Sequence, residues 1–261
     1  MTSAAALPHT LECTVLISAT RATVFGFFTD PERWAAWWGA GSSIEPRPGG
    51  AMRIVYPDGT AATGQVLEIE DGRRVVFTYG YESGKMIPPG GSRVTITLEE
   101  GRTGTLVRLR HELADQGTRD AHVQGWRYQL ALFANVTTRE QHRDAASVID
   151  RYFALWNLGD DVGRRQAMEG VVTPDVIFQD AHGCTAGVDD LAAHIVASRR
   201  FMPGLTLERD GEVRHCQGTA LADWRVTGAD GAVIARGTNV VQLAPDGRIN
   251  RAVGFWGELK R

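Results

Sequence analysis

The chain has 261 residues, of which 43% are hydrophobic and 23% charged, and its formal net charge is −3. These values are typical of a globular protein long enough for two domains, and they exclude a strongly basic nucleic-acid surface or a polybasic membrane patch. Since no apolar run could span a bilayer and the N-terminus has no signal-peptide pattern, we expect a cytoplasmic protein without nucleic-acid or membrane partners. Three widely spaced cysteines predict no disulfide framework, and we expect no metal or cofactor.

The first half of the chain predicts one strand, two helices, several strands and a long helix. Residues 11–18 form an apolar run of β type, and the second helix has an N-cap signal in Asp30 followed by Pro31. Apolar and polar residues alternate clearly along 92–100, which predicts a strand with one buried face. Residues 118–140 then predict a single long amphipathic helix.

Three tryptophans occupy one stripe of the second predicted helix, because Trp34, Trp37 and Trp38 are spaced i, i+3, i+4. An aromatic stripe is usually core and sometimes the wall of a ligand cavity. We predict Trp34 to be core, and we leave both roles open for Trp37 and Trp38. Polar strand residues such as His111 indicate a solvated face or the lining of a cavity rather than catalysis.

Four segments of the first half resemble, in this order, the START/Bet v 1-like (SRPBCC) superfamily, in the branch named after the activator of the heat-shock-protein-90 ATPase. They are ATVFGFFTDPERWAAWWG, EPRPGGAMRIVYPDG, GQVLEIEDGRRVVFTY and HVQGWRYQLALF, and the resemblance covers about residues 9–140. It implies an α+β helix-grip fold, in which a curved antiparallel sheet wraps around a long C-terminal helix. A cavity for small apolar ligands is implied between them, and chaperone activity is not.

The pattern restarts near residue 145 with a new amphipathic helix. A second helical stretch, the strand-like run VIFQD (176–180) and a helix over 187–200 follow. The remainder predicts strand after strand, with GADG and APDG as turn sequences. We therefore expect two domains, 1–142 and 143–261, each with helices covering a curved antiparallel sheet.

The second half resembles the SnoaL/NTF2-like superfamily, through VIDRYFALWNLGD, TPDVIFQDAHG, GVDDLAAHI and GTNVVQLAPDGRINRAVGFW. The resemblance covers about residues 144–258 and implies a cone-shaped α+β barrel. Ketosteroid isomerases, polyketide cyclases and non-catalytic binding proteins share this fold, so the fold alone assigns no activity. Domains of this kind often pair through the exposed sheet face, and a homodimer through the C-terminal domain is therefore an expectation.

The resemblance to ketosteroid isomerases implies roles for three residues. Asp180 would remove a proton next to a ketone, and Tyr152 and Asn239 would donate hydrogen bonds to the resulting enolate oxygen. Asn239 departs from the family pattern, which has an acid there, and an amide can donate a hydrogen bond but carries no acid proton. The residue pattern agrees in part, because Asn239 is the one polar residue on the apolar face of its strand (233–243).

Each of these residues has an ordinary structural alternative. Asp180 could close its strand with an Asx turn, Tyr152 could be a core tyrosine, and Asn239 could bridge to a neighbouring strand or a buried water. A glycine follows His182, which suggests a turn at the surface. The expected ligand-binding residues are Phe178, Trp156, His182, Trp224 and Trp256 in the second domain, with Trp37 and Trp38 in the first.

Three hypotheses for function follow. In the first, the protein binds small hydrophobic molecules and the C-terminal domain is an enolising isomerase or cyclase acting on a ketone or polyketide-like substrate. In the second, it is a non-catalytic ligand-binding or stress-related protein. The third is an epoxide hydrolase, which needs an inward Asp–Arg–Asp set that the sequence does not provide, because Asp223 and Arg225 alternate with an inward Trp224.

Overall fold

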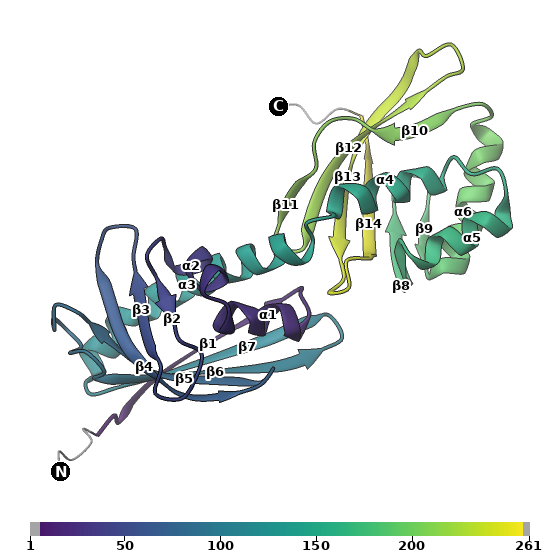
Figure 1. The fold of residues 1–261 in the computed structure, drawn as a ribbon. Helices are drawn as coiled ribbons and strands as arrows, with labels where there is room; N and C mark the ends of the chain where they lie inside the picture. Colours follow the sequence, from purple (N-terminus) through teal and green to yellow (C-terminus); the bar gives the residue numbers. More distant parts are fainter. Residues whose placement is uncertain (1–5, 258–261) are drawn as a thin grey trace. The chain divides into compact units, whose positions relative to one another are not determined.

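We analysed a computed structural model, which describes residues 6–257. The chain divides into two compact units, residues 1–138 and 139–261, and each combines helices with a seven-stranded sheet (Figure 1). The α+β class expected from the sequence is therefore confirmed. Within 6–257 no helix has both the length and the apolar character needed to cross a membrane.

The first unit is a sheet with strand order β1-β7-β6-β5-β4-β3-β2 and antiparallel pairing throughout. Helices α1 (Arg21–Thr29), α2 (Pro31–Trp38) and α3 (Gln116–Gln141) lie on one side of it (Figure 1), which is the helix-grip arrangement. The strands are β1 (His9–Ile17), β2 (Ser43–Ile44), β3 (Ala51–Val55), β4 (Ala61–Glu70), β5 (Arg74–Tyr81), β6 (Ser92–Gly101) and β7 (Gly104–Leu113).

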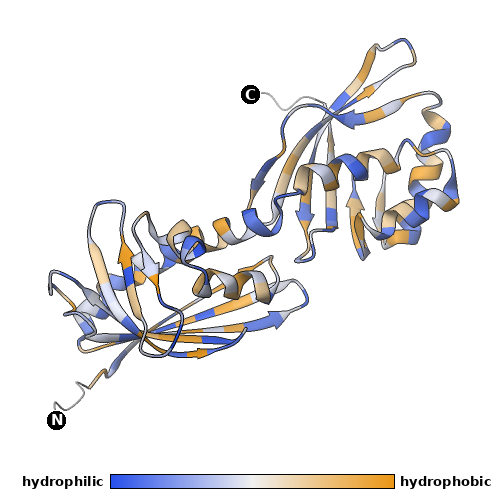
Figure 2. Cartoon of the chain, viewed as in Figure 1, coloured by the Kyte–Doolittle hydropathy of each residue, from blue (hydrophilic) through white to orange (hydrophobic). Residues whose placement is uncertain are grey.

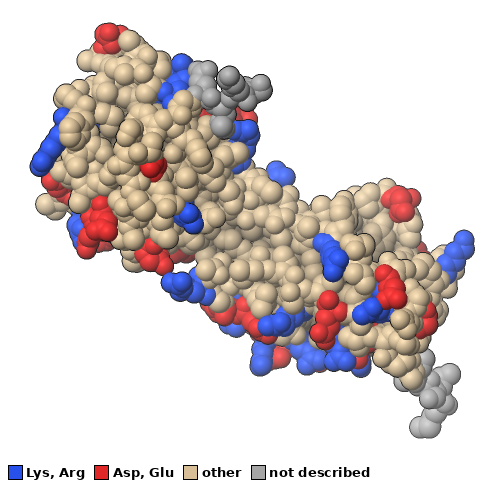
Figure 3. Space-filling model, turned by 180° about the vertical axis from the view of Figure 1, so that it is seen from behind, with Lys and Arg blue, Asp and Glu red and all other residues tan. Residues whose placement is uncertain are grey.

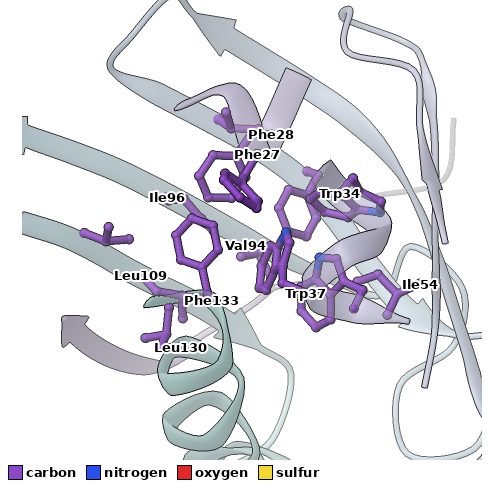
Figure 4. Packing of buried hydrophobic residues seen from close by; sticks show 14 of the residues in the cluster. Phe27, Phe28, Trp34, Trp37, Ile54, Val94, Ile96, Leu109, Leu130 and Phe133 are labelled. Atoms are coloured by element: carbon purple, nitrogen blue, oxygen red, sulfur yellow. The ribbon is translucent and has the colours of Figure 1, made fainter. Parts of the chain in front are cut away.

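An aromatic core fills the space between this sheet and its helices (Figure 4). Trp34 has no exposed surface, as predicted, and its ring lies edge-on to Trp37, with centroids 5.6 Å apart. The predicted start of α2 is confirmed, because Asp30 Oδ1 accepts a hydrogen bond from the Glu32 amide at 2.8 Å. Hydrophobic and hydrophilic residues alternate along the strands (Figure 2), which is why one sheet face meets the core and the other does not.

Ion pairs cover the outer face of the same sheet, where acidic and basic side chains are interspersed (Figure 3). Arg53 binds Glu82 and Arg108 binds Glu99, each at 2.7 Å and each about half exposed. Such exposed pairs contribute at most about 1 kcal/mol apiece. The outer face of the sheet is therefore polar and its ion pairs add little stability.

The second unit has strand order β10-β12-β13-β14-β8-β9, with β11 paired to β12. Its strands are β8 (Val172–Gln179), β9 (Cys184–Ala186), β10 (Thr206–Arg209), β11 (Arg214–Cys216), β12 (Thr219–Thr227), β13 (Val233–Leu243) and β14 (Ile249–Trp256). Its helices are α4 (Ala145–Leu155), α5 (Asp161–Glu169) and α6 (Val188–Phe201). The strand order described for 6–257 ends at β10 and β9 without closing, so the cone is an open curved sheet rather than a closed barrel.

One strand pair departs from the antiparallel sheet that the sequence suggested. Strand β8 runs parallel to β14, whereas the other pairs of this sheet are antiparallel. The path of the chain sets this direction. The chain leaves β8 through β9 and α6, and it returns to pair with β8 only in β14. This parallel pair brings the end of β8 beside the end of β14, where the candidate site lies.

Candidate functional site

Three neighbouring strands place Asp180, Gly254 and Asn239 in a row across the sheet. Asn239 of β13 lies opposite Gly254 of β14, and Val253 of β14 lies beside Gln179 of β8. One residue further along β8, Asp180 therefore flanks Gly254 from the other side. The residues come from distant parts of the sequence, and the pairing of β13, β14 and β8 alone brings them together.

Gly254 leaves the space between the two polar side chains open. A Cβ atom at this position would lie 3.2 Å from Asn239 Oδ1 and 3.3 Å from Asp180 Cβ. Both distances are shorter than comfortable van der Waals contact. A glycine at this point therefore creates a hollow with an acid on one side and an amide on the other.

A cavity of about 60 Å³ occupies this hollow, and we call it the cup. Residues from α4, β8, β12, β13, β14 and the end of α6 line it: Phe153, Trp156, Asn157, Phe178, Asp180, Arg199, Met202, Leu205, Leu207, Trp224, Val226, Asn239, Gly254 and Trp256. A wider mouth of about 450 Å³ shares Trp156, Asp180, Met202 and Trp256 with the cup. Of the three residues expected in one cup, Asp180 and Asn239 line this cavity and Tyr152 does not.

The orientation of the Asn239 amide follows from its neighbour. Its Oδ1 accepts a hydrogen bond from the Trp224 indole N–H at 2.9 Å, and both residues are buried. Because an indole nitrogen can only donate, the oxygen must face Trp224. The amide NH₂ of Asn239 is thus not engaged by Trp224 and is free to donate to another group.

Asp180 forms the Asx turn that was its structural alternative, and it also lines the cup. Its Oδ1 accepts from the His182 amide at 2.7 Å, which is the Asx turn, and its Oδ2 accepts from the Trp256 indole at 3.3 Å. The side chain is half-buried and lines both the cup and the mouth. Since the contact with Trp256 is long, Oδ2 is the oxygen more readily available to a ligand.

Tyr152 does not line the cup, in contrast to the role expected for it. The side chain is completely buried, and its hydroxyl lies beside the Trp156 indole with no hydrogen-bond partner of normal geometry for either group. Burial, and secondarily the charge of Asp180, raise the pKa of Tyr152. Trp156 and Phe153, on the same helical turn, take the lining positions instead. The indole of Trp156 lines the cup, whereas its N–H is buried beside the Tyr152 hydroxyl.

The expected ligand-binding residues divide between the cup and its mouth. Phe178, Trp156, Trp224 and Trp256 line the cup. His182 is exposed at the mouth, where its ring lies edge-on to Trp256 with centroids 5.2 Å apart. The aromatic wall of the predicted site is therefore assembled, with one residue placed further outward.

Sequence reasoning missed Arg199, Met202 and Gly254. A signal for the first two was present, because Leu191, Ile195, Arg199 and Met202 recur at helical spacing along one face. A cation on an otherwise apolar stripe predicts a buried polar contact. Gly254 carried no such signal, since its role depends on what lies on the two neighbouring strands.

The first unit has a cavity of its own, of about 260 Å³, between the sheet and α3. Its lining is more polar and consists of Trp38, Tyr56, Tyr79, Tyr81, Met86, Ala121, His122, Gly125, Trp126 and Gln129. Trp38 is thus a wall residue, whereas Trp37 is absent from the lining and packs against Phe133 with ring centroids 4.7 Å apart.

A hydrogen-bonded chain behind this cavity fixes the protonation of His111. The Trp126 indole donates to Nδ1 at 2.9 Å, so the ring proton is on Nε2, which donates to Ser92 Oγ at 2.8 Å. Ser92 in turn donates to the Tyr79 carbonyl at 2.8 Å. Burial lowers the pKa of His111 to about 3, so the ring is neutral. His111 is therefore part of the buried framework rather than of a solvated face.

Metal ligands do not gather anywhere in the described part of the chain, where no three His, Cys, Asp or Glu side chains lie close enough together to hold an ion. The polar groups of both cavities are hydroxyl, indole, amide, imidazole, guanidinium and carboxylate groups. Such groups bind organic ligands by hydrogen bonds and charge.

Comparison with known families agrees with this geometry. Residues 18–137 match the family described as activator of Hsp90 ATPase homolog 1-like protein, and residues 149–252 match the SnoaL-like domain. The chain is thus a protein in which an AHSA1-like domain is followed by a SnoaL-like domain, as the sequence indicated.

Solved structures resemble parts of the chain. A proposed isomerase of the SnoaL-like family from Agrobacterium tumefaciens is 29% identical, covering 46% of this chain and 99% of its own, with a TM-score of 0.42. CalU16 from Micromonospora echinospora is 26% identical, covering 48% of this chain and 75% of its own, with a TM-score of 0.40. MLL2253 from Mesorhizobium loti is 21% identical, with coverages of 48% and 94% and a TM-score of 0.44. No curated protein matches the chain.

Proposed function

We propose that the second domain binds a small apolar ketone in the cup and moves a proton next to its carbonyl group, as an enolising isomerase or cyclase does. One observation carries this proposal: Asp180 and Asn239 face the same apolar hollow from the two sides of Gly254. The first is a proton acceptor, and the second presents amide N–H groups to an oxygen. Proton abstraction beside a carbonyl uses a proton acceptor for the carbon and a hydrogen-bond donor for the oxygen.

The chemistry assigns one step to each residue. Asp180 Oδ2 takes a proton from the carbon next to the carbonyl, and the electrons of the broken C–H bond move onto the carbonyl oxygen. The NH₂ group of Asn239 stabilises the negative oxygen. Asp180 then returns the proton to a carbon further along the conjugated system, so the double bond shifts and no other reactant is consumed.

The walls of the cup assist this step. Phe178 and Trp224 are buried apolar surfaces that displace water from the ligand. Hydrogen bonds to a developing oxyanion are worth more where water is excluded. The binding of the ketone and the stabilisation of its enolate therefore use the same wall.

Cyclohex-3-enone provides a direct test, because its isomerisation to cyclohex-2-enone creates a conjugated enone that absorbs in the ultraviolet. We expect the full chain to accelerate this isomerisation and Asp180→Asn to lower the rate by about 10²-fold or more. The asparagine can still accept the His182 amide bond, so the turn and the fold are kept. Asp175→Asn, on the same strand but exposed, is the matched control.

A second candidate is ligand binding without chemistry, and a specific observation favours it. Both carboxylate oxygens of Asp180 already accept hydrogen bonds within the protein, so neither is free of a protein partner. If the full chain leaves cyclohex-3-enone unchanged while still binding apolar molecules in the cup, this second function holds. The cavity beside α3 gives the first domain the same binding role.

The epoxide-hydrolase hypothesis has no support in the cup. Asp223 accepts a hydrogen bond from Thr238 at 2.5 Å, and Arg225 pairs with Glu208 at 2.7 Å. Neither Asp223 nor Arg225 is among the residues that line the cup. Both belong to the opposite face of β12, as their alternation with Trp224 predicted.

A further inference from the structure

Arg199 is a cation in the wall of the cup without an anionic partner among the described residues. Its Nη1 donates to the Trp156 carbonyl at 2.6 Å, and this is its hydrogen bond within the described chain. Other arginines of this unit have acids: Arg209 binds Asp150 at 2.7 Å, and Arg225 binds Glu208 at 2.7 Å. Arg199 is half-buried and differs from them in facing a cavity.

The lining of the cup gives Arg199 no acid bonded to it. Apolar side chains dominate the lining, among them Phe153, Leu205 and Val226. The one acid in the lining is Asp180, whose oxygens are bonded to His182 and Trp256 rather than to the guanidinium. A partly buried charge without a partner is costly unless something pairs with it.

The guanidinium of Arg199 has the free N–H groups and the fixed orientation needed to bind an anion. Four of its five N–H groups are not used by the bond to Trp156, and that bond holds the planar group in place at the end of α4. A planar guanidinium fixed in this way matches a carboxylate, which can accept two parallel hydrogen bonds.

We infer that the ligand of the cup is an acid: a small apolar molecule with one carboxylate-type anion, bound by Arg199. This inference rests on the proposed function, because it concerns the same cup, and it names the class of ligand. An apolar body packs against Phe178 and Trp224, the anion pairs with Arg199, and a ketone oxygen on the same molecule reaches Asn239. The ligand is then a keto acid rather than a neutral ketone.

Two fluorescent probes with the same ring system test the charge. 8-Anilinonaphthalene-1-sulfonate carries an anion, and N-phenyl-1-naphthylamine is the same molecule without the sulfonate. In the full chain we expect Arg199→Gln to weaken the binding of the anionic probe by about tenfold or more, because a charge-assisted hydrogen bond is lost. The same variant changes the binding of the neutral probe less than about twofold. Arg199→Lys restores part of the anion affinity.

Two controls separate charge from structure. Arg200→Gln removes an exposed arginine next in sequence, and we expect it to change neither affinity. Gly254→Val fills the cup, and we expect it to weaken the binding of both probes. Thermal unfolding of each variant establishes that all of them are folded at the temperature of the titration.

The outcomes distinguish this inference from the proposed function. If Gly254→Val weakens the neutral probe but Arg199→Gln leaves the anionic probe unchanged, the cup binds ligands and the acid assignment is wrong. An equal loss of affinity for both probes in Arg199→Gln also overturns the acid assignment. In that case the arginine contributes only by holding Trp156 in the wall of the cup. If Gly254→Val affects neither probe, the cup is not a ligand site and both proposals fail.

Discussion

At the scale of single residues, an indole N–H fixes the orientation of the Asn239 amide. Trp224 can only donate, so it holds the amide oxygen and turns the NH₂ group away. The family pattern has an acid at this position, and the amide supplies the same donor without an ionisable group. The tryptophan wall is therefore a positioning element as well as an apolar surface.

We predict that Trp224→Phe lowers turnover of cyclohex-3-enone at least tenfold, because the amide is no longer held with its NH₂ toward the substrate. The free energy of unfolding should fall by about 1–3 kcal/mol, since the buried Asn239 oxygen loses its partner. Trp34→Phe is the matched control, because it removes a comparable bond to the Arg53 carbonyl in the other unit. An unchanged rate in Trp224→Phe would show that the amide orientation has no part in catalysis.

The sheet face on which Asp180 and Asn239 lie could be predicted, because alternation along a strand fixes which face a side chain takes. Tyr152 could not be placed by the same logic. A helical stripe shows which residues are buried, but not which of Tyr152, Phe153 and Trp156 reaches a cavity. That depends on the depth at which α4 packs against the sheet, which is a tertiary property.

At the scale of elements, the helix-grip core holds a histidine that must remain neutral. His111 lies between α3 and β6, bonded to Trp126 and Ser92, and burial lowers its pKa to about 3 from its usual 6.5. The unfolded chain therefore binds a proton below about pH 6.5, whereas the folded chain does not until about pH 3. The stability of the first unit must fall as the pH decreases through this range.

We predict that the unfolding free energy of the first unit decreases by about 1.4 kcal/mol per pH unit in the middle of this range, from this residue alone. His111→Gln can accept from Trp126 and donate to Ser92 but cannot titrate, so its loss of stability on acidification should be smaller. Urea unfolding followed by tryptophan fluorescence between pH 7 and pH 4 measures the difference. Parallel curves for the two proteins would show that His111 does not control the acid sensitivity.

The order of elements could be predicted from periodicity and turns, including the long helix, observed as α3 over Gln116–Gln141. The parallel pairing of β8 and β14 could not, because both strands carry similar local patterns in either direction. Strand direction is decided by the path of the intervening chain. The row formed by Asp180, Gly254 and Asn239 therefore could not be derived from residue spacing.

At the scale of the molecule, the boundary between the two compact units falls within the last turn of α3. The division at residues 138 and 139 lies slightly before the domain boundary expected at residues 142 and 143. The position of the boundary matters because of His142. This residue is buried within the second unit, and its ring lies 5.4 Å from that of His215. The second unit therefore includes the end of the helix.

We predict that the fragment 139–261 is more stable than the fragment 143–261, by about 1 kcal/mol or more, because the shorter one loses the packing of His142 on His215. Thermal unfolding followed by circular dichroism compares the two fragments. His142→Ala in the longer fragment should reproduce most of the loss. Equal stabilities would mean that the end of α3 adds nothing to the second unit.

The parallel pairing of β8 and β14 has a further consequence for how the protein is made. During synthesis β8 leaves the ribosome long before β14, which is the last strand of the chain. Until β14 arrives, Asp180 has no Gly254 beside it and Asn239 has no neighbour on that side. The cup is therefore completed only when β14 pairs with β8 and β13, and a chain truncated between the first unit and β14 keeps the first unit but has no cup.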